Sequence, residues 1–340
     1  MTINRTYRSG RRFVKPSYNP PVPILLSLFF LLAVTGPVLA QGLPPLAPIN
    51  PVAASRSGLS FEPYHDARPG RWRLSLAFDY ASTIEYNDQT VATYLLDSEL
   101  LRLQATATRD LAPNAFLLLD AQVGGAYDGF MDGFLDWYHG LLGIEVPERE
   151  RRPRNAFLYD ARLADGTSLN PEPNDLFLGD IRVGLGLRWT GRLQTVAALT
   201  LPTSTGPEGY GRGVVSVNLL NTFRAPITQR LTYEGSLSAG YTPSHGPLSS
   251  SQRELFAAAS SGLRYRFWGK QALYGNLFYH SPYYEETSLP ALDRHELSLD
   301  FGWVLATEGG AEWRLGMTED LQPSGPAIDL VFRAGVSLSP

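Results

Sequence analysis

The sequence predicts an all-β protein: a transmembrane, antiparallel, up-and-down β-barrel of about twelve strands, with a short helix in a long outer loop. Three observations predict this fold. The N-terminus has the layout of an export signal, later segments alternate between apolar and polar residues, and the connections between those segments alternate between short and long. No apolar run after residue 40 reaches the length of a membrane helix, so only a closed barrel could cross a bilayer.

The first forty residues resemble a cleavable signal peptide. Five basic residues and no acidic ones precede the apolar run 24–34, which is too short to span a bilayer. Gly36 and Pro37 then break the run before the small-residue end Val38-Leu39-Ala40. We expect cleavage after Ala40 and export to the outer membrane of a Gram-negative bacterium, whereas an uncleaved anchor would need a longer apolar stretch.

The remaining chain is acidic. Of the 29 Lys and Arg residues, five lie in the leader, so 24 face 33 Asp and Glu and the net charge is −9. This balance argues against a nucleic-acid partner. Lys270 is the single lysine after residue 40, so nearly every cation is a guanidinium, which suits fixed, forked pairing with carboxylates. The absence of cysteine excludes a disulfide scaffold, a thiolate metal site and an acylated lipoprotein.

Residues 41–69 are proline-rich and aperiodic, which predicts an extended periplasmic lead-in to a barrel at residues 70–340. In the first predicted strand, Trp72, Leu74, Leu76, Phe78 and Tyr80 alternate with small or polar residues. The same period recurs down the chain. The predicted strands are 71–80, 101–108, 117–123, 181–189, 194–201, 213–223, 231–241, 255–267, 272–280, 297–305, 312–318 and 328–338.

The connections have the asymmetry of outer-membrane barrels, with short periplasmic turns and longer outer loops. Tight turns are predicted at 110–114, 190–193, 226–230, 268–271 and 307–310. Longer links are predicted at 81–91, 125–179, 202–211, 242–253 and 281–293. Alternation alone does not say which face lies outside, so a soluble β-sandwich or a secreted calyx is the alternative. Against it, a barrel of about twelve strands is too wide for side chains alone to fill an apolar interior.

The polar faces of the predicted strands carry charges of both signs, and we expect these residues to line the lumen. They are Arg73, Arg102, Asp120, Arg182, Arg188, Glu234, Arg264, Arg266, Glu296, Asp300, Arg314, Asp329 and Arg333, together with Asp79, Glu99 and Glu312. Two interpretations stay open. The charges form either cross-strand ion pairs that stiffen a narrow or closed lumen, or the wall of a weakly selective pore.

The long link contains an amphipathic segment, 128–142. Phe130, Phe134, Trp137 and Leu141 recur at helical spacing, with Asp132 and Asp136 on the other side. Such large apolar side chains must be buried somewhere. Our hypothesis is a plug helix that narrows the lumen from the outer side, with its acids paired to wall arginines; a membrane-surface or partner-binding role is the alternative.

No other pattern indicates an enzyme or a cofactor. The five histidines fall in the lead-in and in predicted loops or at their edges, without a neighbouring Ser-Asn-Gly segment, so a membrane lipid hydrolase is only a remote alternative. The acids at 128, 132 and 136 lack the dense oxygen-rich loop of a calcium motif and are better explained as a solvated helix face. The mixed charge run 148–154 predicts a solvated loop, whose guanidiniums could also contact lipopolysaccharide phosphates.

Several short motifs, in order, resemble an uncharacterised Gram-negative family of outer-membrane barrels, domain of unknown function 3187. They are Gly42-Leu43-Pro44, Asn50-Pro51, Asp97-Ser98-Glu99, Leu101-Arg102, Gly124-Gly125-Ala126-Tyr127-Asp128, Phe134, Trp137-Tyr138-His139, Gly143 and Gly179-Asp180. The resemblance covers nearly all of the exported chain. It implies an outer-membrane barrel and supplies no activity.

Two functions remain open at this stage: a narrow or plugged channel for small polar solutes, and a structural or surface-binding barrel without transport. The expected partners are outer-membrane lipid, lipopolysaccharide and the barrel assembly machinery. That machinery reads a terminal aromatic residue in many barrels, whereas this chain ends Leu338-Ser339-Pro340.

Overall fold

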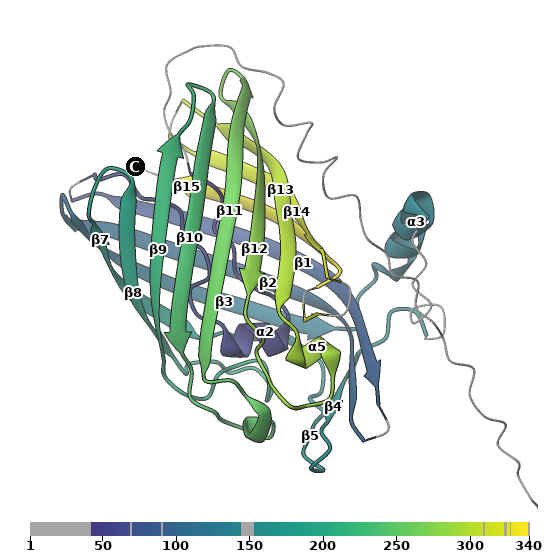
Figure 1. Ribbon diagram of the computed structural model, residues 1–340. Coiled ribbons are helices and arrows are strands. Elements are labelled where there is room, and N and C mark those ends of the chain that lie inside the picture. The colour runs from purple at the N-terminus through teal and green to yellow at the C-terminus, as the bar shows by residue number, and fades with distance from the viewer. Residues whose placement is uncertain are drawn as a thin grey trace, which may run out of the picture.

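The computed structural model of the protein describes residues 42–68, 70–89, 91–143, 153–308, 310–322, 325–326 and 328–338. The expected signal peptide and its cleavage site lie outside these residues, as does most of the charge run 148–154. Within them, fifteen strands form one sheet, and twelve of these close into an antiparallel barrel (Figure 1). The predicted fold class is therefore confirmed.

Neighbouring strands in the barrel are consecutive except where three short strands intervene. The barrel strands are β1 (Trp72–Asp88), β2 (Thr93–Ala112), β3 (Ala115–Tyr127), β7 (Ile181–Arg188), β8 (Leu193–Leu201), β9 (Ser216–Pro226), β10 (Leu231–Tyr241), β11 (Leu255–Trp268), β12 (Gln271–His280), β13 (Glu296–Ala306), β14 (Glu312–Asp320) and β15 (Leu330–Leu338). The barrel closes where β1 pairs with β15, from Leu74 opposite Leu338 to Ser82 opposite Leu330.

The alternation of the sequence becomes the two faces of the wall. Leu74, Leu76 and Phe78 on β1 are more than 40% exposed on the outer face, and other strands repeat this apolar outer face. The opposite face carries polar side chains that are almost completely buried, such as Asp79 and Glu234. A wall with an exposed apolar outside and a polar inside is inverted relative to a water-soluble barrel.

The two ends of the barrel differ. At one end, which we call the turn end, two- to five-residue turns join successive strands, for example at residues 113–114 and 269–270. At the other, the loop end, long connections carry the short strands β4 (Leu158–Arg162), β5 (Ser168–Leu169) and β6 (Asn174–Leu178), the helices α3 (Asp132–Leu142) and α5 (Pro290–Asp293), and a 3₁₀ turn at Ser249–Ser251.

The link predicted at 81–91 is instead largely strand, because β1 continues to Asp88 and β2 begins at Thr93. These extensions lose the alternation because both faces are covered. Ser82, Thr83 and Ile84 are all buried. They lie next to an apolar core at the loop end that includes Tyr94, Leu96, Tyr159, Tyr283 and Leu289.

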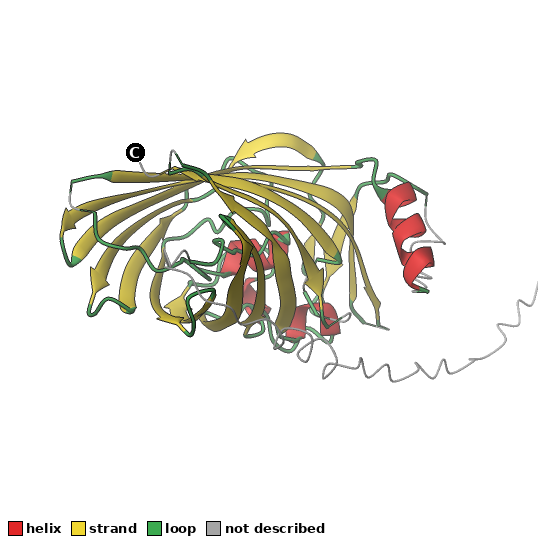
Figure 2. Cartoon of the chain, turned by 90° about the horizontal axis from the view of Figure 1, so that it is seen from above, coloured by secondary structure: helices red, strands yellow, loops and turns green. Residues whose placement is uncertain are grey.

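The N-terminal segment lies inside the barrel. Residues 42–68, which we call the N-terminal plug, contain the helix α2 (Pro51–Arg56) and run through the ring of strands (Figure 2). Asn50 caps α2 by accepting a hydrogen bond from the Val52 backbone N–H at 3.0 Å. The extended periplasmic lead-in that we expected is thus replaced, over its described part, by a folded element within the lumen.

Candidate functional site: the lumen and its N-terminal plug

The plug enters the barrel at the turn end, reaches the loop end and returns. The Gly42 carbonyl accepts a hydrogen bond from Arg264 of β11 at 2.7 Å, near the turn end. At the loop end, Arg56 of α2 donates to the Thr242 and Pro243 carbonyls at 2.6 and 2.9 Å. The returning limb passes Leu46, whose N–H bonds to the Phe61 carbonyl at 3.4 Å, and leaves beside Asp110. The plug therefore extends along the lumen from one end to the other.

Proline content explains how the plug is held. Each proline lacks a backbone N–H donor, so a proline-rich strand cannot pair fully with a sheet and leaves its carbonyls free to accept. Arginine side chains, which only donate, supply the missing partners. The donor and acceptor pairs are Arg333 to Pro45, Arg102 to Ala47 and Pro48, Arg212 to Ser57, Arg188 to His65 and Arg264 to Gly42.

Carboxylates on the wall fix these arginines in place. Asp79 of β1 lies between Arg102 and Arg333, its cross-strand neighbours, with N–O distances of 2.5 and 3.0 Å. Arg333 also reaches Asp300 at 3.3 Å. The four strands β1, β2, β13 and β15 thus share one buried charge network, and its guanidiniums hold the plug as well as neutralising acids.

A second group of ion pairs continues around the wall. Asp120 pairs with Arg182 at 3.1 Å and also accepts from Gln104 and Thr106. Arg188 pairs with Asp110 at 2.6 Å. Arg264 pairs with Glu312 at 3.1 Å. These pairs match the cross-strand interpretation of the charges more closely than that of an open, hydrated pore.

Glu234 of β10 joins the two limbs of the plug. Its carboxylate accepts the Leu43 N–H on the ascending limb and the Tyr64 N–H on the descending limb, both at 2.6 Å. The side chain is completely buried. One wall carboxylate therefore holds both limbs of the plug at the same level in the lumen.

Five other predicted lumen residues make contacts outside the ion pairs described above. Arg73 contacts the His65 ring at 2.5 Å, and Arg314 donates to the Ser75 and Ser337 hydroxyls at 2.8 and 2.6 Å. Glu296 accepts from the Tyr283 hydroxyl at 2.6 Å. Arg266 lies at the turn end, where it donates to the Gln229 carbonyl at 3.1 Å. Asp329 precedes β15 and accepts the Ile84 N–H at 3.2 Å.

Two predictions about placement need correction. Glu99 shares its face of β2 with Leu101 and Leu103, so it points outward, where it accepts from the Tyr80 hydroxyl and from the backbone N–H groups of Phe130 and Met131. These bonds fix the start of α3 outside the barrel. The helix we expected to narrow the lumen lies against the outer surface instead (Figures 1 and 2).

Contacts of α3 confirm the helical prediction for this segment and define its outer position. The ring centroid of Phe134 lies 5.7 Å from that of Phe332 on β15, and the ring centroid of Phe130 lies 5.6 Å from that of Tyr80. Trp137 and Leu141 remain 62% and 69% exposed. Asp136 pairs with Arg154 at 2.7 Å, and Asp132 accepts the Asn155 N–H at 2.6 Å, so neither acid reaches the lumen arginines.

The comparisons with known proteins fit this geometry. A family model described as a protein of unknown function (DUF3187) matches residues 31–338. The chain belongs to the DUF3187 family. No curated protein matches it.

Among solved structures, a COG4313 outer-membrane channel from Pseudomonas putida F1 is similar to this DUF3187 protein with a TM-score of 0.52 and 13% identity, covering 82% of this chain and all of that one. The toluene transporter TodX from Pseudomonas putida has a TM-score of 0.42 at 10% identity, covering 86% of this chain and 98% of its own. The NanC porin has a TM-score of 0.44 at 6% identity, covering 78% and 98%. At these identities the first similarity shows the shared barrel fold.

No enzymatic constellation is evident in the described part of this DUF3187 protein. Its buried histidines have other contacts: His65 interacts with Glu62 at 2.8 Å, and the His280 ring stacks on Tyr283 at 4.1 Å. The described residues contain no group of three His, Cys, Asp or Glu side chains placed to hold a metal. No helix among them is long and apolar enough to cross a membrane.

The sequence analysis missed the plug, although the sequence contains a signal for it. Leu43, Leu46, Leu59 and Phe61 are large apolar residues in a segment that a solvated linker would not need to make apolar. All four are almost fully buried in the DUF3187 structure. Apolar residues in an aperiodic, proline-rich segment next to an arginine-rich barrel therefore indicate a lumen element.

Proposed function

We propose that this DUF3187 protein is an outer-membrane channel for small polar solutes, held closed by its N-terminal plug and opened when the plug moves. The observation that carries the proposal is the way the plug is held. Several of the wall's contacts to the plug are hydrogen bonds from guanidiniums to backbone carbonyls, and water can replace such bonds at a modest net cost. Apolar contacts also hold the plug, since Leu43, Leu46 and Phe61 pack against wall residues such as Tyr274 and Phe278, so opening must separate this cluster as well as break the hydrogen bonds.

The membrane location rests on the outer face of the wall. Exposed Leu, Val, Phe and Trp side chains recur on alternate positions around the barrel, which water would disfavour and lipid would accept. The fold shared with the COG4313 channel supports the same location.

A structural or surface-binding barrel without transport is the second candidate. The observation that favours it is the filling of the lumen, where Asp79, Asp300 and Glu234 are completely buried around the plug. The two candidates differ in whether the plug moves.

A reversible tether tests this difference, and the cysteine-free chain makes it simple to build. A Cβ placed on Gly58 of the plug would lie 2.9 Å from the Cβ of Asn218 on β9. A shift of less than about 1 Å gives the roughly 3.5–4.5 Å separation of a disulfide. We expect Gly58→Cys/Asn218→Cys to show no openings in planar bilayers when oxidised and to recover them on reduction.

The single variants Gly58→Cys and Asn218→Cys serve as controls and should not respond to oxidation. Equal current in the oxidised and reduced double variant would contradict gating by the plug. Absence of openings in every variant, intact protein included, would favour the structural barrel.

A further inference from the structure

The wall binds the descending limb of the plug, residues 57–65, through its backbone. Gln194 of β8 accepts the His65 N–H and donates to the Pro63 carbonyl, both at 2.8 Å. Buried side chains of β7, β9 and β10 bind the limb in the same way. These pairs are Asn218 with the Leu59 N–H at 3.1 Å, Ser238 with the Leu59 carbonyl at 3.0 Å, Thr222 with the Glu62 carbonyl at 2.8 Å, Glu234 with the Tyr64 N–H at 2.6 Å and Arg188 with the His65 carbonyl at 2.5 Å. We call this part of the wall, formed by β7 to β10, the backbone groove.

The limb follows the groove in a nearly extended conformation. Asn218 and Thr222 are four residues apart on β9, and they bind Leu59 and Glu62, which are three residues apart. Four residues of a strand span about 13 Å, whereas three residues of any chain span at most about 11 Å. A limb that keeps pace with the strand is therefore almost straight, and its amide groups are displayed to the wall.

Two apolar pockets flank the limb and receive side chains two positions apart. Leu59 packs in a buried cluster with Phe116, Leu118, Val196 and Leu220. Phe61 belongs to a second cluster, which includes Tyr274, Phe278 and Val304. Main-chain hydrogen bonds combined with pockets for alternate side chains are the features by which proteins bind extended peptides.

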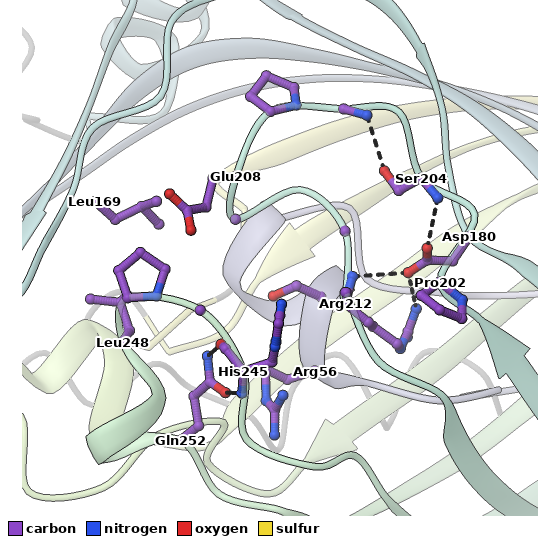
Figure 3. Close-up of a pocket in the computed structure, with 18 of the residues that line it drawn as sticks. Arg56, Leu169, Asp180, Pro202, Ser204, Glu208, Arg212, His245, Leu248 and Gln252 are labelled. Carbon is purple, nitrogen blue, oxygen red and sulfur yellow. Dashed lines mark hydrogen bonds and ion pairs between the residues drawn. The ribbon is translucent and has the colours of Figure 1, made fainter.

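The groove continues at the loop end. The Ser57 carbonyl accepts from Arg212, which Asp180 fixes by accepting its backbone N–H at 3.0 Å and its guanidinium at 3.1 Å (Figure 3). A cavity of about 190 Å³ lies beside this end of the limb, between the outer connections 202–215 and 242–254, with Ser55 and Arg56 in its lining. A chain bound in the groove therefore has room to continue beyond the position of Ser57.

We propose that the backbone groove binds a short extended peptide in place of the descending limb, and that such peptides are the solutes of the channel. The wall recognises amide groups that every peptide carries, so a chain of another sequence can form the same bonds. The two pockets select apolar side chains at alternate positions. Passage of peptides through the barrel rests on the proposed function, whereas binding needs only that the limb can leave the wall.

Fluorescence anisotropy on the full mature chain in lipid nanodiscs tests the binding. The probe is the amidated peptide Gly-Leu-Ser-Phe-Glu-Pro-Tyr-His, the sequence of residues 58–65, with a dye on a flexible linker at its N-terminus. The barrel is Leu59→Ala/Phe61→Ala, which empties both pockets and leaves every wall residue in place. We expect micromolar binding to this barrel. Binding to the intact protein should be at least about tenfold weaker, because its own limb competes at a high effective concentration.

Hydrogen exchange of residues 59–65 shows whether the limb has loosened, and it should be faster in the double variant. Phe61→Ala alone, a milder change, should bind the probe with intermediate affinity. Unchanged exchange in the double variant would contradict the role of the pockets. A barrel whose limb exchanges faster but that does not bind the probe would overturn the proposal.

Two altered peptides separate the groove from a merely apolar attraction. N-methylation of the tyrosine amide removes the donor to Glu234 and should weaken binding at least about tenfold. The same sequence in D-amino acids keeps the composition and should not bind, so equal affinities of the two enantiomers would also overturn the proposal. Specific peptide binding to a barrel that never conducts would leave the groove standing and refute the channel alone. Conduction without peptide binding would refute the groove alone.

Discussion

Asp79 on β1 and Arg102 on β2 form an ion pair at 2.5 Å, directly across the strands, and Arg102 uses its other donors to hold the Ala47 and Pro48 carbonyls of the plug. The aspartate is completely buried, so its partners cannot be replaced by bulk water while the barrel is closed. Strand pairing and plug attachment are thus coupled through one side chain.

Removal of the Asp79 charge should loosen the plug. Asp79→Asn leaves Arg102 and Arg333 buried without their shared carboxylate, and breaking a buried pair in this way costs about 3–5 kcal/mol. We expect a lower unfolding temperature on heat-modified gel mobility and more frequent openings in bilayers. Asp88→Asn, at the exposed end of the same strand, is the control and should change neither. An Asp79→Asn barrel that unfolds at the temperature of the intact protein and opens no more often would contradict the coupling.

Loss of the Glu234 carboxylate should loosen the backbone of the plug more than that of the wall. Glu234→Ala removes the acceptor of both the Leu43 and Tyr64 N–H groups, each left unpaired at a cost of about 1–3 kcal/mol. Hydrogen exchange of peptides that contain residues 43 and 64 should become faster. Glu234→Gln retains an acceptor oxygen and should have a smaller effect. Unchanged exchange at both peptides in Glu234→Ala would show that other contacts hold the plug.

The position of α3 leads to a prediction about its surroundings. Trp137 is exposed on a helix that packs against outward aromatic residues of the wall, so we expect it to lie in the membrane interface. A nitroxide at Trp137→Cys should be more accessible to oxygen than to a water-soluble nickel complex. Asp136→Cys, whose native side chain pairs with Arg154, should show the opposite preference. Equal preferences would place the helix in water or against another protein.

Deletion of α3 should leave conductance unchanged. Replacement of residues 129–142 by a short Gly/Ser linker removes a helix outside the wall, and heat-modified mobility can establish that the barrel still folds. Increased current through the folded deletion would restore our original hypothesis that this helix narrows the lumen.

The barrel could be predicted from the sequence because alternation is local: each residue such as Leu74 or Leu76 shows its face through its immediate neighbours. The alternation fails at Ser82 to Glu85, where packing covers both sides of β1, and the strand was mistaken for a loop. The plug could not be predicted from the sequence for a different reason. Its contacts join residues far apart in the chain, as from Arg333 to Pro45, and no spacing pattern records such pairs.

The faces on which the charged residues lie could also be predicted from local alternation. Their inward positions follow from strand parity. Parity also places Glu99 on the outer, apolar face of β2 with Leu101 and Leu103, so its assignment to the lumen, which rested on its charge, was wrong. The helix at 132–142 could be predicted from its own periodicity, whereas its position depends on hydrogen bonds from Phe130 and Met131 to that one glutamate.

The central claim is that residues 42–68 close the barrel, and the most direct test is the current through a barrel that lacks them. A chain with its signal peptide joined to residue 67 should insert, fold and retain heat-modified mobility, because the twelve strands are intact. In planar bilayers we expect a steady open current from this deletion, with a single-channel conductance well above that of any event in the intact protein. A folded deletion that conducts no more than the intact barrel would contradict it.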